Sequence, residues 1–201
     1  LHISRDDSVT LLAFLGTGQG VPTAFCTLLN GATLCLFNLR EEGITGLANW
    51  LMAEEITVYI SASTVFRHLI RTLTGRERFP KLRLIRLGAE QVRKSDVELY
   101  RKHFAPRCLF GVTLSATESG NYSHYFMDHE TEITGETVPV RYAAEDMKIL
   151  LLDDDGREIA FNEIGEITVK SRYLSPGYWR NPDLTATVFL PDPKGGEERI
   201  Y

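Results

Sequence analysis

Cysteine is scarce in this sequence and forms no metal-binding or disulfide pattern. Cys26, Cys35 and Cys108 are scattered among 201 residues, with no CxxC pair and no nearby pair of histidines. This arrangement excludes a disulfide framework and a zinc site of the usual spacing. We therefore expect a protein of a reducing compartment, the cytoplasm, in which the cysteines act as small hydrophobic residues.

Excess positive charge and long apolar runs are also lacking. The formal net charge of −5 gives no reason to expect nucleic acid or an anionic membrane as a partner. No apolar run approaches the roughly 20 residues that cross a bilayer, and we expect no signal peptide. The content of 43% hydrophobic and 24% charged residues is ordinary for a globular protein.

An initiating methionine is lacking too. Residues 1–7 resemble the continuation of an element that begins earlier in a longer chain, and residues 198–201 resemble the middle of a strand. We therefore expect the chain to be an internal piece of a longer protein.

Residues 8–118 alternate short apolar runs with amphipathic stretches. The apolar runs predict strands at 9–15, 32–37, 57–60, 82–87 and 107–113. The amphipathic stretches predict helices at 21–29, 46–53, 64–73 and 95–103. This repeated alternation predicts the α/β fold class, with a parallel sheet and helical crossovers.

The helical period is lost in the second part of the sequence. Residues 120–136 are polar and aperiodic, and we predict a long loop there. Strands are predicted at 148–152 and 166–170, and the Asp-Gly step between them favours a hairpin. The sequence thus predicts two parts, an αβ subdomain at 1–134 and a small antiparallel, β-barrel-like subdomain at 135–201.

A glycine-rich turn, Gly16–Gly20, follows the first predicted strand and opens the first predicted helix. Such a turn can bring a phosphate group to the free amides of a helix N-terminus. With Glu41 after the next strand it resembles a dinucleotide-binding βαβ unit, although Val21 stands where that motif has its third glycine. The alternative is a tight turn whose backbone needs glycine.

Small and polar residues end two further predicted strands. The segment 88–90 follows strand 82–87, where small side chains let a flat ring lie against the backbone. In the segment 114–118, Thr117 and Glu118 offer a hydroxyl and a carboxylate for phosphate and magnesium. Taken alone, the first segment is better explained as an ordinary strand-ending turn and the second as a solvated loop.

A longer motif runs through residues 164–169 and 174–189. It matches, at many positions and in order, the pattern GELxIxGxxVxxGYWxxPxLTxxxF. That pattern is the signature of the adenylate-forming enzyme superfamily, so the chain resembles these enzymes, and most of all the adenylation domain of a nonribosomal peptide synthetase. Physically the segment predicts a strand, a turn, an aromatic anchor and a short helix capped near Asn181.

The resemblance extends to the shorter motifs. Residues 28–34 match LLSGATL, residues 88–90 match the GGE turn that borders the adenine, and residues 114–118 match YGPTE. The resemblance implies ATP and Mg²⁺ as cofactors, with the metal held by Glu118. The implied nucleotide-binding residues are Gly88, Ala89, Glu90, Leu114, Ser115 and Ala116, and the implied catalytic residues are Thr117 and Glu118.

Members of this superfamily activate a carboxylic acid with MgATP to an acyl-adenylate. The acyl group then passes to the phosphopantetheine thiol of a carrier protein or to coenzyme A. The phosphate loop, the ribose-binding aspartate and the catalytic lysine of the family have no match within these 201 residues. We therefore expect the isolated chain to be inactive.

The resemblance also implies an acyl pocket. The matched positions are Gly18, Gln19, Ile60, Ile85, Leu87, Thr113, Asn121 and Tyr122. Gly18 stands where amino-acid-activating members carry an aspartate, so a bound α-ammonium would lack its counter-charge. A lining with few charges suits an apolar or aryl acid.

Three other interpretations remain open at this point. An acyl- or aryl-CoA ligase of the same superfamily would share all of these motifs. A dinucleotide-binding oxidoreductase rests on the turn Gly16–Gly20 alone. A non-catalytic interaction module is suggested by the absence of the aspartate at Gly18 and by Leu114, which replaces the tyrosine of YGPTE.

Overall fold

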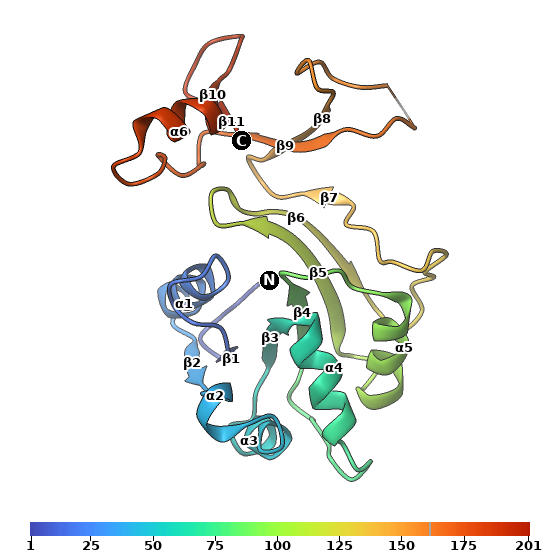
Figure 1. The fold of residues 1–201 in the computed structure, drawn as a ribbon. Helices are drawn as coiled ribbons and strands as arrows, with labels where there is room; N and C mark the ends of the chain where they lie inside the picture. The colour runs from blue at the N-terminus through green and yellow to red at the C-terminus, as the bar shows by residue number, and fades with distance from the viewer. Residues whose placement is uncertain (161) are drawn as a thin grey trace.

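The computed structural model describes residues 1–160 and 162–201. Figure 1 shows a large β-sheet with helices packed on both of its faces and a small second sheet formed by the C-terminal part of the chain. Among the described residues, every helix is too short or too polar to cross a lipid bilayer.

The large sheet has seven strands and five accompanying helices. Its strands are β1 (Ser8–Leu11), β2 (Thr33–Leu36), β3 (Val58–Ala62), β4 (Leu84–Gly88), β5 (Leu109–Ala116), β6 (Gly120–Met127) and β7 (Tyr142–Ala143). The helices are α1 (Gly20–Leu29), α2 (Leu39–Glu42), α3 (Leu47–Ala53), α4 (Ser63–Thr72) and α5 (Lys94–His103). The strand order is β2-β1-β3-β4-β5-β6-β7.

The first five strands of this sheet pair in parallel, which confirms the predicted parallel sheet with helical crossovers. The small sheet contains β8 (Lys148–Leu152), β9 (Glu166–Ser171), β10 (Leu190–Pro191) and β11 (Arg199–Ile200), with helix α6 (Pro182–Val188) beside it. Its pairs are all antiparallel, as predicted. The predicted division after residue 134 falls in the segment between β6 and β7.

The prediction of a long loop at 120–136 is wrong. Residues 120–127 form strand β6, which pairs antiparallel with β5, and β7 then pairs antiparallel with β6. Ser123, Tyr125 and Met127 are buried and alternate with more exposed residues, which is the period of a half-buried strand. The period was hidden because serine and tyrosine occupy inward positions that are usually aliphatic.

The two faces of the large sheet carry separate hydrophobic clusters. Helices α3, α4 and α5 cover one face, where Phe66 and Phe110 pack with ring centroids 5.8 Å apart. Ile60 and Leu84 belong to the smaller cluster of the opposite face. Because successive residues of a strand point to opposite faces, the central strands β3 and β4 contribute to both clusters.

The start of helix α1 depends on glycine. A methyl group on Gly20 would lie 2.2 Å from the carbonyl oxygen of Phe14, closer than atoms can approach. The hydroxyl of Thr17 accepts a hydrogen bond from the Gly20 amide at 3.0 Å and thereby holds the same turn. The glycine-rich segment is therefore required by close packing of the backbone.

We predict that Gly20→Ala lowers the free energy of unfolding by about 1–3 kcal/mol or more, because the added methyl group overpacks the turn. Gly46→Ala is the matched control, since its methyl group would meet no atom closer than 3.9 Å at a φ of −79°. We expect that control to be neutral or stabilising by about 0.4–1 kcal/mol. Urea denaturation measures both, and equal effects of the two substitutions would contradict the packing argument.

Candidate functional site

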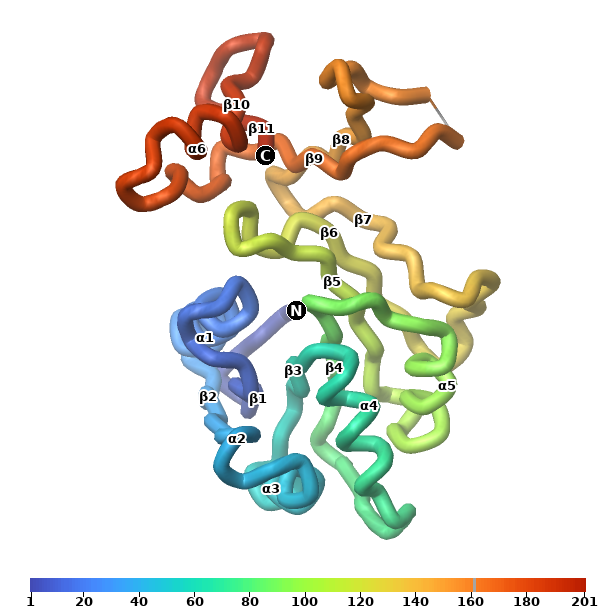
Figure 2. Tube along the Cα trace, viewed as in Figure 1, coloured from blue at the N-terminus to red at the C-terminus, as the bar shows by residue number. Residues whose placement is uncertain are grey.

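The segments matched to the site meet at one edge of the large sheet. Strands β1, β4 and β5 run parallel, so the residues that follow them lie along the same edge. These residues are Gly18 and Gln19 after β1, the turn 88–90 at the end of β4, and the segment 114–118 at the end of β5. Figure 2 shows the tip of the β5–β6 hairpin between the start of α1 and the C-terminal sheet.

Close contacts join these segments. A methyl group on Gly18 would lie 2.9 Å from Thr117 Oγ1, and one on Gly88 would lie 2.9 Å from Thr113 Oγ1. The methyl group on Gly88 would also lie 3.7 Å from Gln19 Nε2. The structure therefore brings together residues from the implied acyl pocket, nucleotide turn and phosphate motif.

The turn after β4 presents its backbone to the site. Ala89 has a φ of 64°, in the left-handed region that favours glycine. The carboxylate of Glu90 accepts hydrogen bonds from the amide and the hydroxyl of Thr64, both at 2.7 Å. Glu90 thus caps the N-terminus of α4, which leaves the backbone of Gly88 and Ala89 as the part of this turn that can contact a ligand.

An ion pair between the partly exposed Arg67 and the buried Asp96 joins helices α4 and α5, which precede and follow this turn. The guanidinium of Arg67 donates to both carboxylate oxygens of Asp96, at 2.7 and 2.8 Å, and to the carbonyl of Gln91. Asp96 also accepts from the amide of Arg93 at 2.8 Å. The hydrogen bonds that Arg67 donates to Asp96 raise the pKa of Arg67, so the guanidinium stays charged at neutral pH and the bidentate pair holds the two helices in a fixed geometry.

Thr117 and Glu118 lie in the tight connection between β5 and β6. The carboxylate of Glu118 accepts a hydrogen bond from the Tyr178 hydroxyl at 3.0 Å, and its carbonyl oxygen accepts from the Ser175 amide at 2.7 Å. Both partners belong to the signature segment that precedes α6. Glu118 therefore connects the hairpin of the large sheet to the small sheet.

Tyrosine side chains surround this carboxylate. Burial and the nearby charge of Glu118 raise the pKa of Tyr201 to about 12. Burial, together with the hydrogen bond to Glu118, also raises the pKa of Tyr178. Tyr122 packs with this C-terminal cluster. The phenols therefore remain neutral at physiological pH, and Tyr178 acts as a donor to the carboxylate.

The donor set fits a magnesium ion that is held mainly by a nucleotide. Among the described residues, no three His, Cys, Asp or Glu side chains gather as a metal site. Mg²⁺ is commonly bound by one or two carboxylates plus phosphate oxygens and water. Glu118 would supply the carboxylate, one oxygen of which accepts the hydrogen bond from Tyr178.

A cavity of about 250 Å³ opens next to this edge, between α1 and the sheet. Ile60, Thr113 and Asn121 line it, so the structure brings these three implied pocket residues together. The sequence analysis missed two further lining residues, Arg86 and His124. Burial lowers the pKa of Arg86 to about 10, which leaves the guanidinium positively charged at neutral pH.

Ile85 and Leu87 do not reach this cavity. Both are completely buried in the main hydrophobic cluster, on the face covered by α4 and α5. A shift of one residue along a strand exchanges its two faces, so β4 presents Arg86 to the pocket instead, and Gly88 lies on the same face two residues further on. The signal was present in the sequence as a single arginine within the apolar run of β4.

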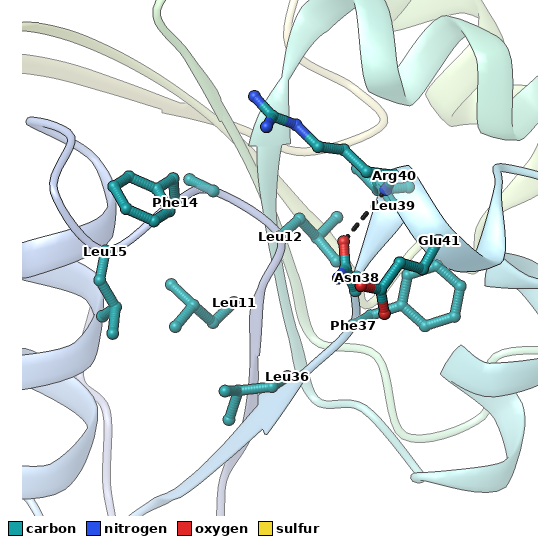
Figure 3. Close-up of a pocket in the computed structure, with 11 residues that line it drawn as sticks. Leu11, Leu12, Phe14, Leu15, Leu36, Phe37, Asn38, Leu39, Arg40 and Glu41 are labelled. Carbon is teal, nitrogen blue, oxygen red and sulfur yellow. Dashed lines mark hydrogen bonds between the residues drawn. The ribbon is translucent and has the colours of Figure 1, made fainter.

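A second, larger hollow of about 490 Å³ lies beyond the ends of β1 and β2. Figure 3 shows that its wall is mostly apolar, with Leu11, Leu15 and Leu36 on one side and Arg40 and Glu41 on the other. The amide of Arg40 donates to Asn38 at 3.2 Å and starts the short helix α2. This hollow does not include the glycines of the turn 16–20, which are explained by packing.

Comparisons with known proteins agree with this geometry. Residues 2–179 match the family described as AMP-binding enzyme. Bacitracin synthase 3 of Bacillus licheniformis is 29% identical over 204 residues, which cover 100% of this chain and 3% of that protein. The chain therefore spans a small fraction of such relatives.

Solved structures share the fold. The crystal structure of CmiS6 superposes with a TM-score of 0.89 and 22% identity, over 100% of this chain and 49% of that one. A second structure is described as "NpsA-ThdA, an artificially fused Adenylation-PCP di-domain NRPS from Klebsiella oxytoca". It gives a TM-score of 0.78 and 18% identity, over 98% of this chain and 36% of that one. From the match over 178 of its 201 residues, we conclude that the chain belongs to the AMP-binding enzyme family.

Proposed function

We propose that the protein containing this chain is a cytoplasmic enzyme that activates a carboxylic acid with MgATP to an acyl-adenylate. The observation that carries this proposal is the convergence of Gly18, Gly88, Thr113 and Thr117 beside a cavity of about 250 Å³. In such a site a nucleotide on the turn 88–90 and an acid in the cavity would meet next to Thr117 and Glu118. Family membership supports the same reaction class.

The chemical difficulty of this reaction is that a carboxylate must attack a negatively charged phosphate. Catalysis therefore depends on charge neutralisation and orientation more than on a nucleophilic side chain. Mg²⁺, when bound, supplies positive charge to the phosphate oxygens. Glu118 would hold the ion, Thr117 would donate a hydrogen bond to a phosphate oxygen, and the backbone of Gly88 and Ala89 would lie against the adenine.

We further propose that the acyl group passes to the phosphopantetheine thiol of a carrier protein, with coenzyme A as the alternative acceptor. The similarity to a fused adenylation–PCP di-domain and to bacitracin synthase 3 favours the carrier protein. The isolated 201-residue chain should not catalyse adenylation, because it has no match to the phosphate loop, the ribose aspartate or the lysine of the family.

We predict that Glu118→Gln in the full-length protein slows acid-dependent pyrophosphate–ATP exchange by about 100-fold, or a few kcal/mol of activation free energy. The amide oxygen of glutamine still accepts the hydrogen bond from Tyr178, so the contact between the two sheets is retained. Thr117→Ala should be milder, because a neutral hydrogen bond is weaker than a charge-assisted one.

Tyr178→Phe is the matched control for this experiment. It removes the 3.0 Å hydrogen bond that Glu118→Gln retains and keeps the Glu118 carboxylate that Glu118→Gln removes, so exchange should fall by no more than about 10-fold. If Glu118→Gln changes neither the rate nor the Mg²⁺ dependence, Glu118 is not a metal ligand. The non-catalytic interpretation would then gain support.

We also predict that the enzyme prefers acids without an α-ammonium group by at least about 10-fold in kcat/KM, because an ammonium ion in this pocket lacks a counter-charge. Gly18→Asp would be a poor test, since its side chain would press against Thr117 at 2.9 Å. Gln19→Glu places a carboxylate beside Gly88 with little change in shape and should raise relative activity toward α-amino acids. A wild-type preference for the amino acid would refute the idea.

A further inference from the structure

Arg86 is a buried charge in the middle of β4. Its side chain is 4% exposed, and with Ile60 and Thr113 it lines the cavity of about 250 Å³. The carbon stem of Arg86 lies beside Gly111 of the neighbouring strand, where a methyl group would be 3.7 Å from its Cγ, an ordinary contact distance. The same methyl group would lie 2.7 Å from the ring of Phe126, so the absence of a side chain at Gly111 makes room for Phe126, which also lines the cavity.

The guanidinium of Arg86 has no counter-charge within the described part of the chain. Its Nε atom is buried without a hydrogen-bond partner, and no ion pair of the described residues includes Arg86. The titratable side chains that face it are the Cys26 thiol and the His124 imidazole. Neither is a carboxylate, and no Asp or Glu of the described residues lines the cavity.

The other buried charged residues of the described chain differ from Arg86, because each of them has a partner of opposite charge. Asp7 pairs with Arg83 at 2.7 Å, and Asp96 pairs with Arg67 at 2.7 Å. Both carboxylates are as buried as Arg86, and both have a partner. A buried charge without a partner loses its hydration and gains nothing in return, so it destabilises the protein unless a ligand supplies the opposite charge.

We propose that the acid activated by this protein carries a second carboxylate, which pairs with Arg86 inside the cavity. This inference rests on the proposed function and adds the substrate class. A carboxylate matches the planar guanidinium in a bidentate pair, which is the strongest neutralisation available to a buried arginine. Without an aspartate at Gly18, the favoured substrate is a dicarboxylic acid that lacks an α-ammonium group.

The order of residues along β4 sets the direction of the substrate. Gly88 lies two residues beyond Arg86 on the same face, about 7 Å further along the strand, beside Gln19 and Thr113. Gly88 is therefore nearer to the edge where Thr117 and Glu118 lie. The reacting carboxylate would point to this edge, and Arg86 would hold the distal one.

The size of the cavity limits the length of the acid. A volume of about 250 Å³ equals about eight water molecules at about 30 Å³ each. Short aliphatic dicarboxylates with about eight to ten non-hydrogen atoms fit this space, by the same volume arithmetic. Succinate, glutarate and adipate are the probes of choice, and their monoamides have nearly the same shape with one charge fewer.

The test uses the full-length protein and two measurements. Without ATP, the dicarboxylates should raise the melting temperature of the wild type, and each monoamide should need at least about 10-fold higher concentration for the same shift. In pyrophosphate–ATP exchange, kcat/KM for the best dicarboxylate should exceed that for its monoamide by at least about 10-fold. Arg86→Met should reduce both ratios to about one, whereas Arg86→Lys should keep part of them.

Two controls separate binding from folding. Arg86→Met should melt above the wild type when no ligand is present, because it replaces an unpaired buried charge by an apolar side chain of similar length. Arg71→Gln removes an exposed arginine of α4 and should leave the preference for dicarboxylates unchanged. A variant that fails to fold is thereby recognised before any substrate is compared.

Each outcome decides a different statement. Three results would overturn the assignment of Arg86. They are equal use of dicarboxylates and monoamides by the wild type, a preference for dicarboxylates that survives in Arg86→Met, and a melting temperature of the wild type that a dicarboxylate leaves unchanged. If no acid supports exchange but a dicarboxylate still stabilises the protein through Arg86, the proposed reaction fails while the anion site stands. If the protein activates only acids without a second carboxylate, the proposed reaction stands and the pairing with Arg86 fails.

Discussion

Parallel pairing of the strands governs the arrangement of the site. Hydrogen bonds between β1, β3, β4 and β5 place the carboxyl ends of these strands along one edge, so segments far apart in the sequence meet there. The segments lie so close together that a methyl group on Gly18 would meet Thr117 at 2.9 Å, and one on Gly88 would meet Thr113 at 2.9 Å. The ion pair between Arg67 and Asp96 then keeps the helices beside the turn at fixed positions.

The hairpin of β5 and β6 has a second role, because it connects the two sheets. Glu118 contacts Tyr178 through its carboxylate and Ser175 through its backbone. The residue that would bind the metal therefore also contacts the segment that belongs to the small sheet. A movement of that sheet would change the hydrogen bonding of the carboxylate, and metal binding would in turn compete with Tyr178 for one of its oxygens.

Much of the fold could be predicted from the sequence because the strands and helices of the first half have clear hydrophobic periods. Strand β6 was missed because Ser123 and Tyr125 occupy its buried positions. In the site, Ile60, Thr113 and Asn121 were predicted and meet at the cavity, whereas Ile85 and Leu87 lie on the other face. Arg86 could have been found from strand alternation, but the contact of Glu118 with Tyr178 spans 60 residues and has no local signal.

The alternation along β4 has a consequence for how such a protein can diverge. Ile85 and Leu87 support the core, while Arg86 lines the cavity, although the three residues are neighbours in the chain. Selection for a stable fold and selection for a new substrate therefore act on different positions of the same strand. A change at residue 86 alters the chemistry offered to a ligand and leaves the packing of residues 85 and 87 untouched, so ligand preference can drift in small steps without loss of the scaffold.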